Sequence, residues 1–205
     1  MPIKDWIRSL MGTATEHEAK QPADPDDLIA LSRVSTAMET ELGYEPAYEA
    51  GLVFSDISSI DFEKSLEEVK GVIHHQDQTE NADLEMKDVH GNQWIVVQDS
   101  SVESLFANLQ YGASAMESVE YDSRLLAAVA PFEKGDRTAY VVYSFKRGKF
   151  YPFVPTTTNE RDRPEENRIE ALLREEIDVE EDVQYWYPLW PPSKDLHPWE
   201  TIGDN

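Results

Sequence analysis

The stretch that decides the fold, residues 139–153, reads AYVVYSFKRGKFYPF. Together with residues 124–131, RLLAAVAP, it gives three short apolar segments separated by breaks that contain Gly135 and Gly148. Short apolar segments with glycine-containing breaks between them are typical of a three-stranded antiparallel meander. Because only Gly148 in the second break favours positive φ, we expect a type I turn with a bulge at this glycine.

The middle segment of this meander carries large apolar side chains on both faces. Tyr140 and Val142 share one face of a strand, whereas Val141 and Tyr143 share the other. A strand that is apolar on both sides is expected in the interior of a sheet, with helices covering at least one face.

The order of the predicted elements indicates the fold class. From residue 50 we expect a strand at 51–57, a helix around 62–73, a hairpin over 82–99, a helix over 102–116 and then the meander. This order predicts an α+β fold, in which an antiparallel-rich sheet of about six strands contains a ferredoxin-like βαββαβ core with helices on one face.

Additional helices are expected on either side of this core. Asp24 and Pro25 are suited to cap and open a helix that Gly43 ends, and Pro164 opens a second helix with Ile169 and Leu172 on its apolar face. We therefore predict a single α+β domain over residues 24–192.

The composition places the chain among folded proteins. Of its 205 residues 40% are hydrophobic and 10% aromatic, which argues against intrinsic disorder despite a net charge of -23. Without an apolar run of about 18 residues, and with charged residues interrupting the first segment, we expect neither a membrane span nor a cleavable signal peptide. The predicted location is the cytoplasm, with peripheral membrane contact as a further option.

The charge balance restricts the possible partners. The chain has 41 acidic and 18 basic residues, a surface that repels nucleic acid and anionic lipid. A strongly acidic surface suits a halophilic protein, because molar salt shortens the screening length to about 3 Å.

The N-terminal segment, residues 1–12, has an amphipathic helical pattern. Trp6, Ile7 and Leu10 fall on one face, so this helix either packs on its own domain, docks on a partner or lies in a membrane interface. Residues 13–23 are polar and aperiodic, which predicts a linker between this helix and the domain.

The C-terminal part contains an unusual aromatic and proline-rich run, YWYPLWPP at residues 185–192. Such a run either covers the core in an extended conformation or presents a patch that includes Trp186 and Trp190 to another protein. Residues 193–205 are expected to form a flexible tail.

Residue patterns that indicate catalysis or a cofactor are weak. His74, His75 and His90 lack a further ligand at metal-binding spacing, the chain has no cysteine, and no glycine-rich phosphate loop is present. We therefore expect no enzyme, metal or cofactor. The densest basic group includes Lys146, Arg147 and Lys149, and either binds an acidic partner or protects a strand edge.

Three blocks give the chain a resemblance to a known family. Residues 123–129 (SRLLAAV), 143–155 (YSFKRGKFYPFVP) and 186–190 (WYPLW), with the amphipathic start, resemble PspAB, the PspA-associated family, in its haloarchaeal form. The resemblance implies a non-enzymatic accessory of phage-shock-type envelope stress systems. It also implies association with PspA, a membrane-remodelling coiled-coil protein, or with HtpX-type membrane metalloproteases.

Two functional hypotheses follow. The first is an adaptor that binds a PspA-like protein or a membrane protease at the cytoplasmic membrane face. Its predicted contact residues are Trp6, Ile7, Leu10, Trp186 and Trp190. The alternative is a small-molecule-sensing domain with a pocket between sheet and helices, lined by Tyr140, Tyr143 and Tyr151.

Overall fold

The computed structural model describes residues 23–55, 67, 71, 82–89, 91–118, 124–157 and 159–203. The predicted N-terminal helix at 1–12, the linker before Ala23 and most of the helix expected around 62–73 lie outside these residues, as do His74, His75 and His90.

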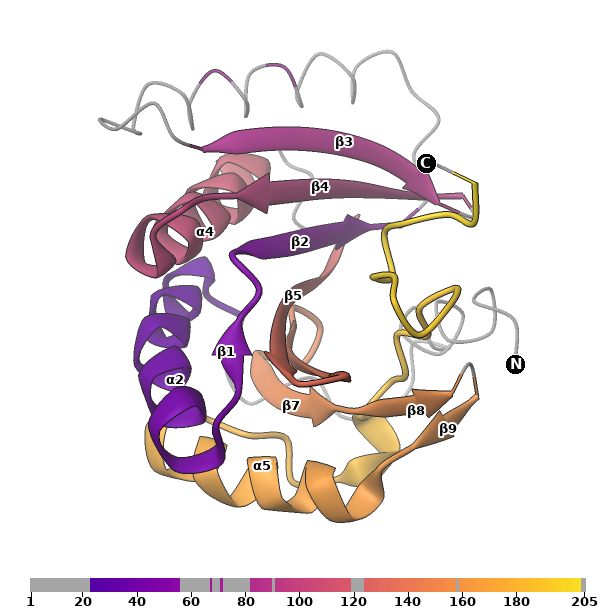
Figure 1. Cartoon of the computed structure of the whole chain (residues 1–205). Helices are drawn as coiled ribbons and strands as arrows, with labels where there is room; N and C mark the ends of the chain where they lie inside the picture. Colours follow the sequence, from indigo (N-terminus) through magenta and orange to yellow (C-terminus); the bar gives the residue numbers. More distant parts are fainter. Residues whose placement is uncertain are drawn as a thin grey trace.

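An antiparallel sheet forms the centre of the described structure (Figure 1). Its seven strands are β1 (Glu45–Pro46), β2 (Glu49–Phe54), β3 (Asp83–Val89), β4 (Asn92–Gln98), β5 (Leu125–Lys134), β6 (Arg137–Ser144) and β7 (Lys149–Phe153). The strand order is β3-β4-β2-β5-β6-β7, and β1 pairs with β5. Because β4 lies between β3 and β2, and β2 lies between β4 and β5, the first four long strands have the predicted ferredoxin-like arrangement.

The meander predicted from the opening stretch is formed by β5, β6 and β7. Its two turns follow the pairs Lys134↔Arg137 and Ser144↔Lys149. Gly135 and Gly148 take positive φ, at 62° and 61°, a backbone conformation that glycine adopts without steric cost. A two-stranded sheet of β8 (Pro155–Thr157) and β9 (Glu160–Arg161) follows the meander.

The helices begin and end at the predicted signals. The Asp24 side chain accepts a hydrogen bond from the Asp26 amide at 2.9 Å, and Gly43 ends the helical segment with φ of 71°. This segment is a 3-10 helix (Pro25–Ala30), then α2 (Leu31–Ala37), then a π-helical turn (Met38–Leu42). The other helices used below are α4 (Val102–Ser118) and α5 (Arg163–Glu176), with Asp162 as the N-cap of α5.

The helices pack on one face of the sheet, as predicted (Figure 1). We call the buried cluster between them and the sheet the helix-side core. Its helical members include Leu28, Leu31, Val34, Met38, Leu105, Phe106, Leu109, Ala113, Met116, Ile169, Leu172 and Leu173. The apolar stripe of α4 therefore lies where its sequence period places it.

The opposite face of the sheet is covered by the end of the chain, residues 183–203, which we call the C-terminal strap. The yellow trace of Figure 1 follows this segment along the side of the sheet away from the helices. It completes a second cluster, the strap-side core. The members of this core include Val53, Trp94, Val96, Val129, Tyr140, Val142, Tyr151, Phe153, Trp186, Leu189 and Trp199.

Packing of the described chain continues beyond residue 192, where the predicted domain ends. Trp199 is 1% exposed and lies in the strap-side core, so the chain still packs on the sheet at this residue, within the stretch that the sequence analysis expected to be a flexible tail. The aromatic run at 185–192 likewise covers the core, one of the two alternatives left open above. Apolar burial on the second sheet face is the physical reason for both placements.

Candidate interaction site

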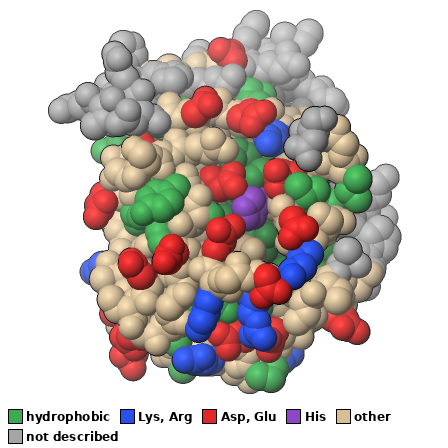
Figure 2. Space-filling model, in the orientation of Figure 1, with side chains coloured by type: hydrophobic (Ala, Val, Ile, Leu, Met, Phe, Trp, Pro, Cys, Tyr) green, Lys and Arg blue, Asp and Glu red, His purple; other side chains and the backbone are tan. Residues whose placement is uncertain are grey.

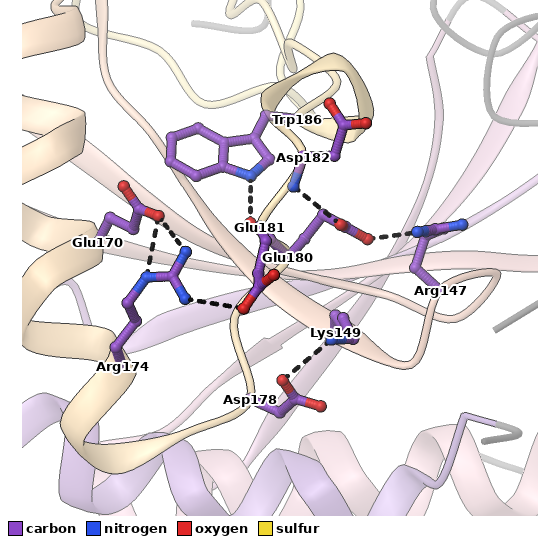
Figure 3. Close-up of polar contacts among 9 residues, drawn as sticks. All are labelled: Arg147, Lys149, Glu170, Arg174, Asp178, Glu180, Glu181, Asp182 and Trp186. Carbon is purple, nitrogen blue, oxygen red and sulfur yellow. Dashed lines mark hydrogen bonds and ion pairs between the residues drawn. The ribbon is translucent and has the colours of Figure 1, made fainter. Parts of the chain in front are cut away.

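The basic residues at the turn between β6 and β7 contact an acidic segment of the same chain, residues 178–182 (Figure 3). Arg147 Nε lies 2.8 Å from Glu180 Oε2, with the two side chains 16% and 5% exposed, and the Arg147 guanidinium stacks on the Tyr185 ring at 4.0 Å. Lys149 forms a more exposed pair with Asp178 at 3.2 Å. The charges of Arg147 and Lys149 are therefore engaged within the chain, which leaves them less available to an acidic partner.

The same acidic segment protects the outer edge of β7. The Phe150 amide donates to the Asp178 carbonyl at 2.9 Å, and the Glu180 amide donates to the Phe150 carbonyl at 2.8 Å. Trp186 Nε1 then donates to the Glu180 carbonyl at 2.8 Å, as Figure 3 shows. The turn, the acidic segment and the beginning of the strap thus form one connected unit.

A buried ion pair between β9 and α5 is hydrogen-bonded to the first part of the strap. Arg161 Nε lies 2.7 Å from Glu166 Oε1, and Arg161 Nη1 donates to the Trp186 carbonyl at 2.6 Å. The Val154 amide also donates to Glu166 Oε1, at 2.9 Å. Burial lowers the pKa of the Arg161 guanidinium, while the charge of Glu166 opposes this change. Arg161 joins β9, α5 and the strap.

The two tryptophans predicted to contact a partner have different surroundings. Trp186 is only 2% exposed, so a partner cannot touch its ring unless the strap moves. Trp190 is partly buried, and its ring packs edge-on against Phe153 with 5.1 Å between centroids. Trp6, Ile7 and Leu10, the other predicted contact residues, lie outside the described residues.

The three tyrosines of the alternative ligand pocket lie on two sides of the sheet. Tyr140 and Tyr151 belong to the strap-side core, whereas Tyr143 belongs to the helix-side core. The Tyr143 hydroxyl donates to Asp27 Oδ2 at 2.9 Å, and the Tyr151 hydroxyl donates to the Tyr187 carbonyl at 3.1 Å. These tyrosines therefore do not line one common pocket.

A polar cluster around His197 was not predicted from the sequence. His197 Nε2 lies 2.9 Å from Glu49 Oε1 on β2, and His197 Nδ1 lies 3.2 Å from the Tyr140 hydroxyl on β6. Burial raises the pKa of the Tyr140 hydroxyl, and the negative charge of the nearby Glu200 raises this pKa further. Trp199, a large aromatic residue two positions after His197, is the sequence signal that would have indicated a packed segment here.

Trp199 fills a socket above the middle of β2. Its ring lies 5.5 Å from the Trp94 ring and stacks on His197 at 5.0 Å between centroids. The socket exists because Gly51 has no side chain: a Cβ atom there would lie 2.8 Å from Trp199 Cε3. His197 and Trp199 together anchor the distal half of the strap.

Between its two anchored parts the strap passes over a cavity of about 320 Å³. Thr138 and Tyr140 line it from β6, Thr156 lines it from β8, and Pro191 and Lys194 line it from the strap.

Figure 2 shows acidic side chains spread over one face of the molecule, with Lys and Arg side chains gathered mainly in the lower half of that view.

Two negative findings apply to the residues that the structure describes. They contain no group of three or more His, Cys, Asp or Glu side chains arranged to hold a metal ion. They also contain no helix of the length and apolar character needed to cross a membrane.

Fold and site define the protein as an acidic α+β domain whose sheet is covered by helices on one face and by its own C-terminal strap on the other. Comparison with protein families then places it: the family model PspAB, described as PspA associated protein B, matches residues 4–199. The chain belongs to the PspAB family, as its sequence blocks indicated. No curated protein matches it.

Proposed function

We propose that the protein is a non-enzymatic adaptor of a phage-shock-type envelope stress response, which binds a PspA-like protein at the cytoplasmic membrane face. The observation that carries the proposal is the family match over residues 4–199, because the family is described by its association with PspA. A role as accessory to the Psp system follows from that membership. The direct partner and the binding residues belong to the proposal.

The burial of Trp186 favours the N-terminal segment as the part of the chain that contacts the partner. Trp186 is a buried core residue in the described fold, whereas Trp6, Ile7 and Leu10 form the amphipathic pattern of a separate predicted helix. An amphipathic helix is a common ligand for an apolar groove or for a partner helix. We therefore assign the first contact to this segment.

The charge of the chain supports a protein partner over direct lipid binding. With a net charge of -23, the surface is repelled by anionic lipid head groups and attracted to basic protein surfaces. In this proposal the partner supplies the membrane contact.

Affinity capture from extract of the host at native salt tests the proposal. The full-length protein is compared with a Trp6→Ala, Leu10→Ala variant, and bound proteins are identified by mass spectrometry. Ile29→Ala is the matched control, because Ile29 is an apolar residue of the domain that is 52% exposed. We expect a PspA-like protein with the wild type and the control, but not with the double variant.

The same experiment separates the two partner classes. Recovery of an HtpX-type membrane protease in place of a PspA-like protein would indicate that the adaptor binds the protease as its partner. Recovery of the bait alone, with and without envelope stress, would contradict the adaptor function. The placement of Tyr140 and Tyr143 in opposite cores gives the ligand-sensing alternative less support than the adaptor.

A further inference from the structure

We propose that the C-terminal strap is a releasable latch that hides a second partner-binding element, the Trp- and Pro-rich segment of the strap itself. In the closed state described here, Trp186, Leu189 and Trp199 are buried against the sheet. In the released state they become accessible to the partner. This inference rests on the proposed adaptor function and names its regulation.

The strap is fixed at two separate places. The proximal anchor comprises the Trp186 carbonyl, which accepts from Arg161 at 2.6 Å, and the Tyr187 carbonyl, which accepts from the Tyr151 hydroxyl at 3.1 Å. The distal anchor comprises His197, paired with Glu49, and the Trp199 ring in its socket. The cavity of about 320 Å³ lies beneath the stretch between them.

Release of the strap does not require the sheet to unfold. Its 3-10 turn (Val183–Tyr185) is followed by residues that belong to no named strand, and none of the described strand pairings includes residues 183–203. The strap is held by side-chain packing and a few hydrogen bonds, without a backbone ladder. A segment held in this way opens locally more readily than a strand in the sheet.

The chemistry of the strap indicates the kind of groove that would receive it. Pro188, Pro191, Pro192 and Pro198 fix φ at four positions of the strap, which reduces the entropy lost on binding. Between residues 183 and 203 only Lys194, Asp195 and Glu200 carry a charged side chain, whereas 29% of the whole chain is charged. The matching surface is therefore an apolar, aromatic-lined groove of the protein partner.

A chemical lock on the strap tests this inference. Lys194 on the strap and Asp136 on the turn before β6 form an exposed pair at 2.7 Å, with side chains 56% and 81% exposed. Because the chain has no cysteine, a variant with Asp136→Cys and Lys194→Cys can be bridged selectively by a short bifunctional thiol reagent. The matched control is the same variant with both thiols capped by a monofunctional reagent.

We expect the bridged protein to capture its partner from host extract about tenfold less efficiently than the capped control, because the binding-competent state is no longer populated. Equal capture by bridged and capped protein would overturn the latch while leaving the adaptor function intact. Absence of capture by the wild type would overturn both. Circular dichroism of both forms establishes that bridging preserves the fold.

An opening variant provides a second measurement. Gly51→Ala places a Cβ atom 2.8 Å from Trp199 Cε3 and leaves every side chain of the strap unchanged. We expect it to weaken the distal anchor and to raise partner capture several-fold over the wild type. Unchanged or reduced capture by a folded Gly51→Ala protein would contradict the release of the strap.

Discussion

Trp199 lies so close to Gly51 that its ring carbon Cε3 is 2.8 Å from the place of a Cβ atom on this glycine. Trp94 approaches the same place to 3.0 Å from the neighbouring strand β4. Gly51 pairs with Val96 and Val129, so it lies within the sheet between β4 and β5. Packing of the distal strap therefore depends on the absence of a side chain at residue 51.

Gly51→Ala should destabilise the protein. Overpacking a filled site costs about 1–3 kcal/mol, which exceeds the gain of roughly 0.5–1 kcal/mol expected from replacing glycine in a strand. The expected result is a lower melting temperature in thermal unfolding followed by circular dichroism. Gly71→Ala is the control, because a Cβ atom there would meet nothing within 4 Å. An unchanged melting temperature for Gly51→Ala would contradict the described socket.

The Arg161–Glu166 pair should be sensitive to loss of one partner. Arg161→Met leaves the Glu166 carboxylate, which is 0% exposed, without its closest cation at 2.7 Å. Because Arg163 remains 3.2 Å from the other Glu166 oxygen, the cost should lie toward the low end of the range of about 3–5 kcal/mol for breaking a buried pair. We expect that loss in the free energy of unfolding measured with urea. Arg168→Met, at an exposed position 3.9 Å from Glu165, should cost less than about 1 kcal/mol.

A double variant tests whether the two groups are coupled. Arg161→Met with Glu166→Leu removes both charges, and apolar replacement of a whole buried pair is often close to neutral in stability. The double variant should therefore be more stable than Arg161→Met alone. If its loss equals the sum of the two single losses, the groups act independently and the proposed coupling is wrong.

Arg147 and Lys149 should differ in their contributions to stability, although only one residue separates them: Arg147 lies in the turn between β6 and β7, and Lys149 is the first residue of β7. Arg147→Met removes a largely buried pair with Glu180 and the contact with Tyr185, and should cost roughly 2–4 kcal/mol. Lys149→Met removes an exposed pair, with an expected cost below about 1 kcal/mol. Thermal unfolding at low and high salt checks this, since only the Lys149 effect should disappear under screening. Equal losses for both variants would contradict it.

Elements with a local pattern could be predicted from the sequence. The buried positions Leu105, Leu109 and Met116 of α4 follow from helical spacing, and the meander turns follow from Gly135 and Gly148. Strand alternation also shows why the tyrosine pocket does not form. Residues three apart on a strand, such as Tyr140 and Tyr143, point to opposite faces.

Contacts between distant segments could not be predicted in this way. The Tyr140 and His197 side chains that meet at 3.2 Å are 57 residues apart, and neither residue has a neighbour pattern that identifies the other. The strap has prolines and no helical period, so its burial depends on the apolar second face of the sheet. Only the folded sheet creates that surface, and the socket of Trp199 requires two strands to be paired.

The Glu49 carboxyl gives the strap a pH-dependent contribution to stability. Burial alone would raise its pKa, but the hydrogen bond and charge of His197, with a hydrogen bond from Gln98, lower the pKa below its ordinary value of 4.5. A group whose pKa is lower in the folded state stabilises the protein above its unfolded-state pKa. This contribution is lost as the pH falls through the folded-state pKa.

Comparison of wild type with Glu49→Gln over the acidic range tests this linkage. The difference in their free energies of unfolding, measured with urea at fixed salt, should shrink as the pH falls through the acidic range below the unfolded-state pKa of Glu49. Asp195→Asn is the control, because it removes a carboxylate from an exposed strap residue. An advantage of the wild type over Glu49→Gln that grows with acidification would show that the pKa of Glu49 is raised on folding, and that His197 does not stabilise its charged form.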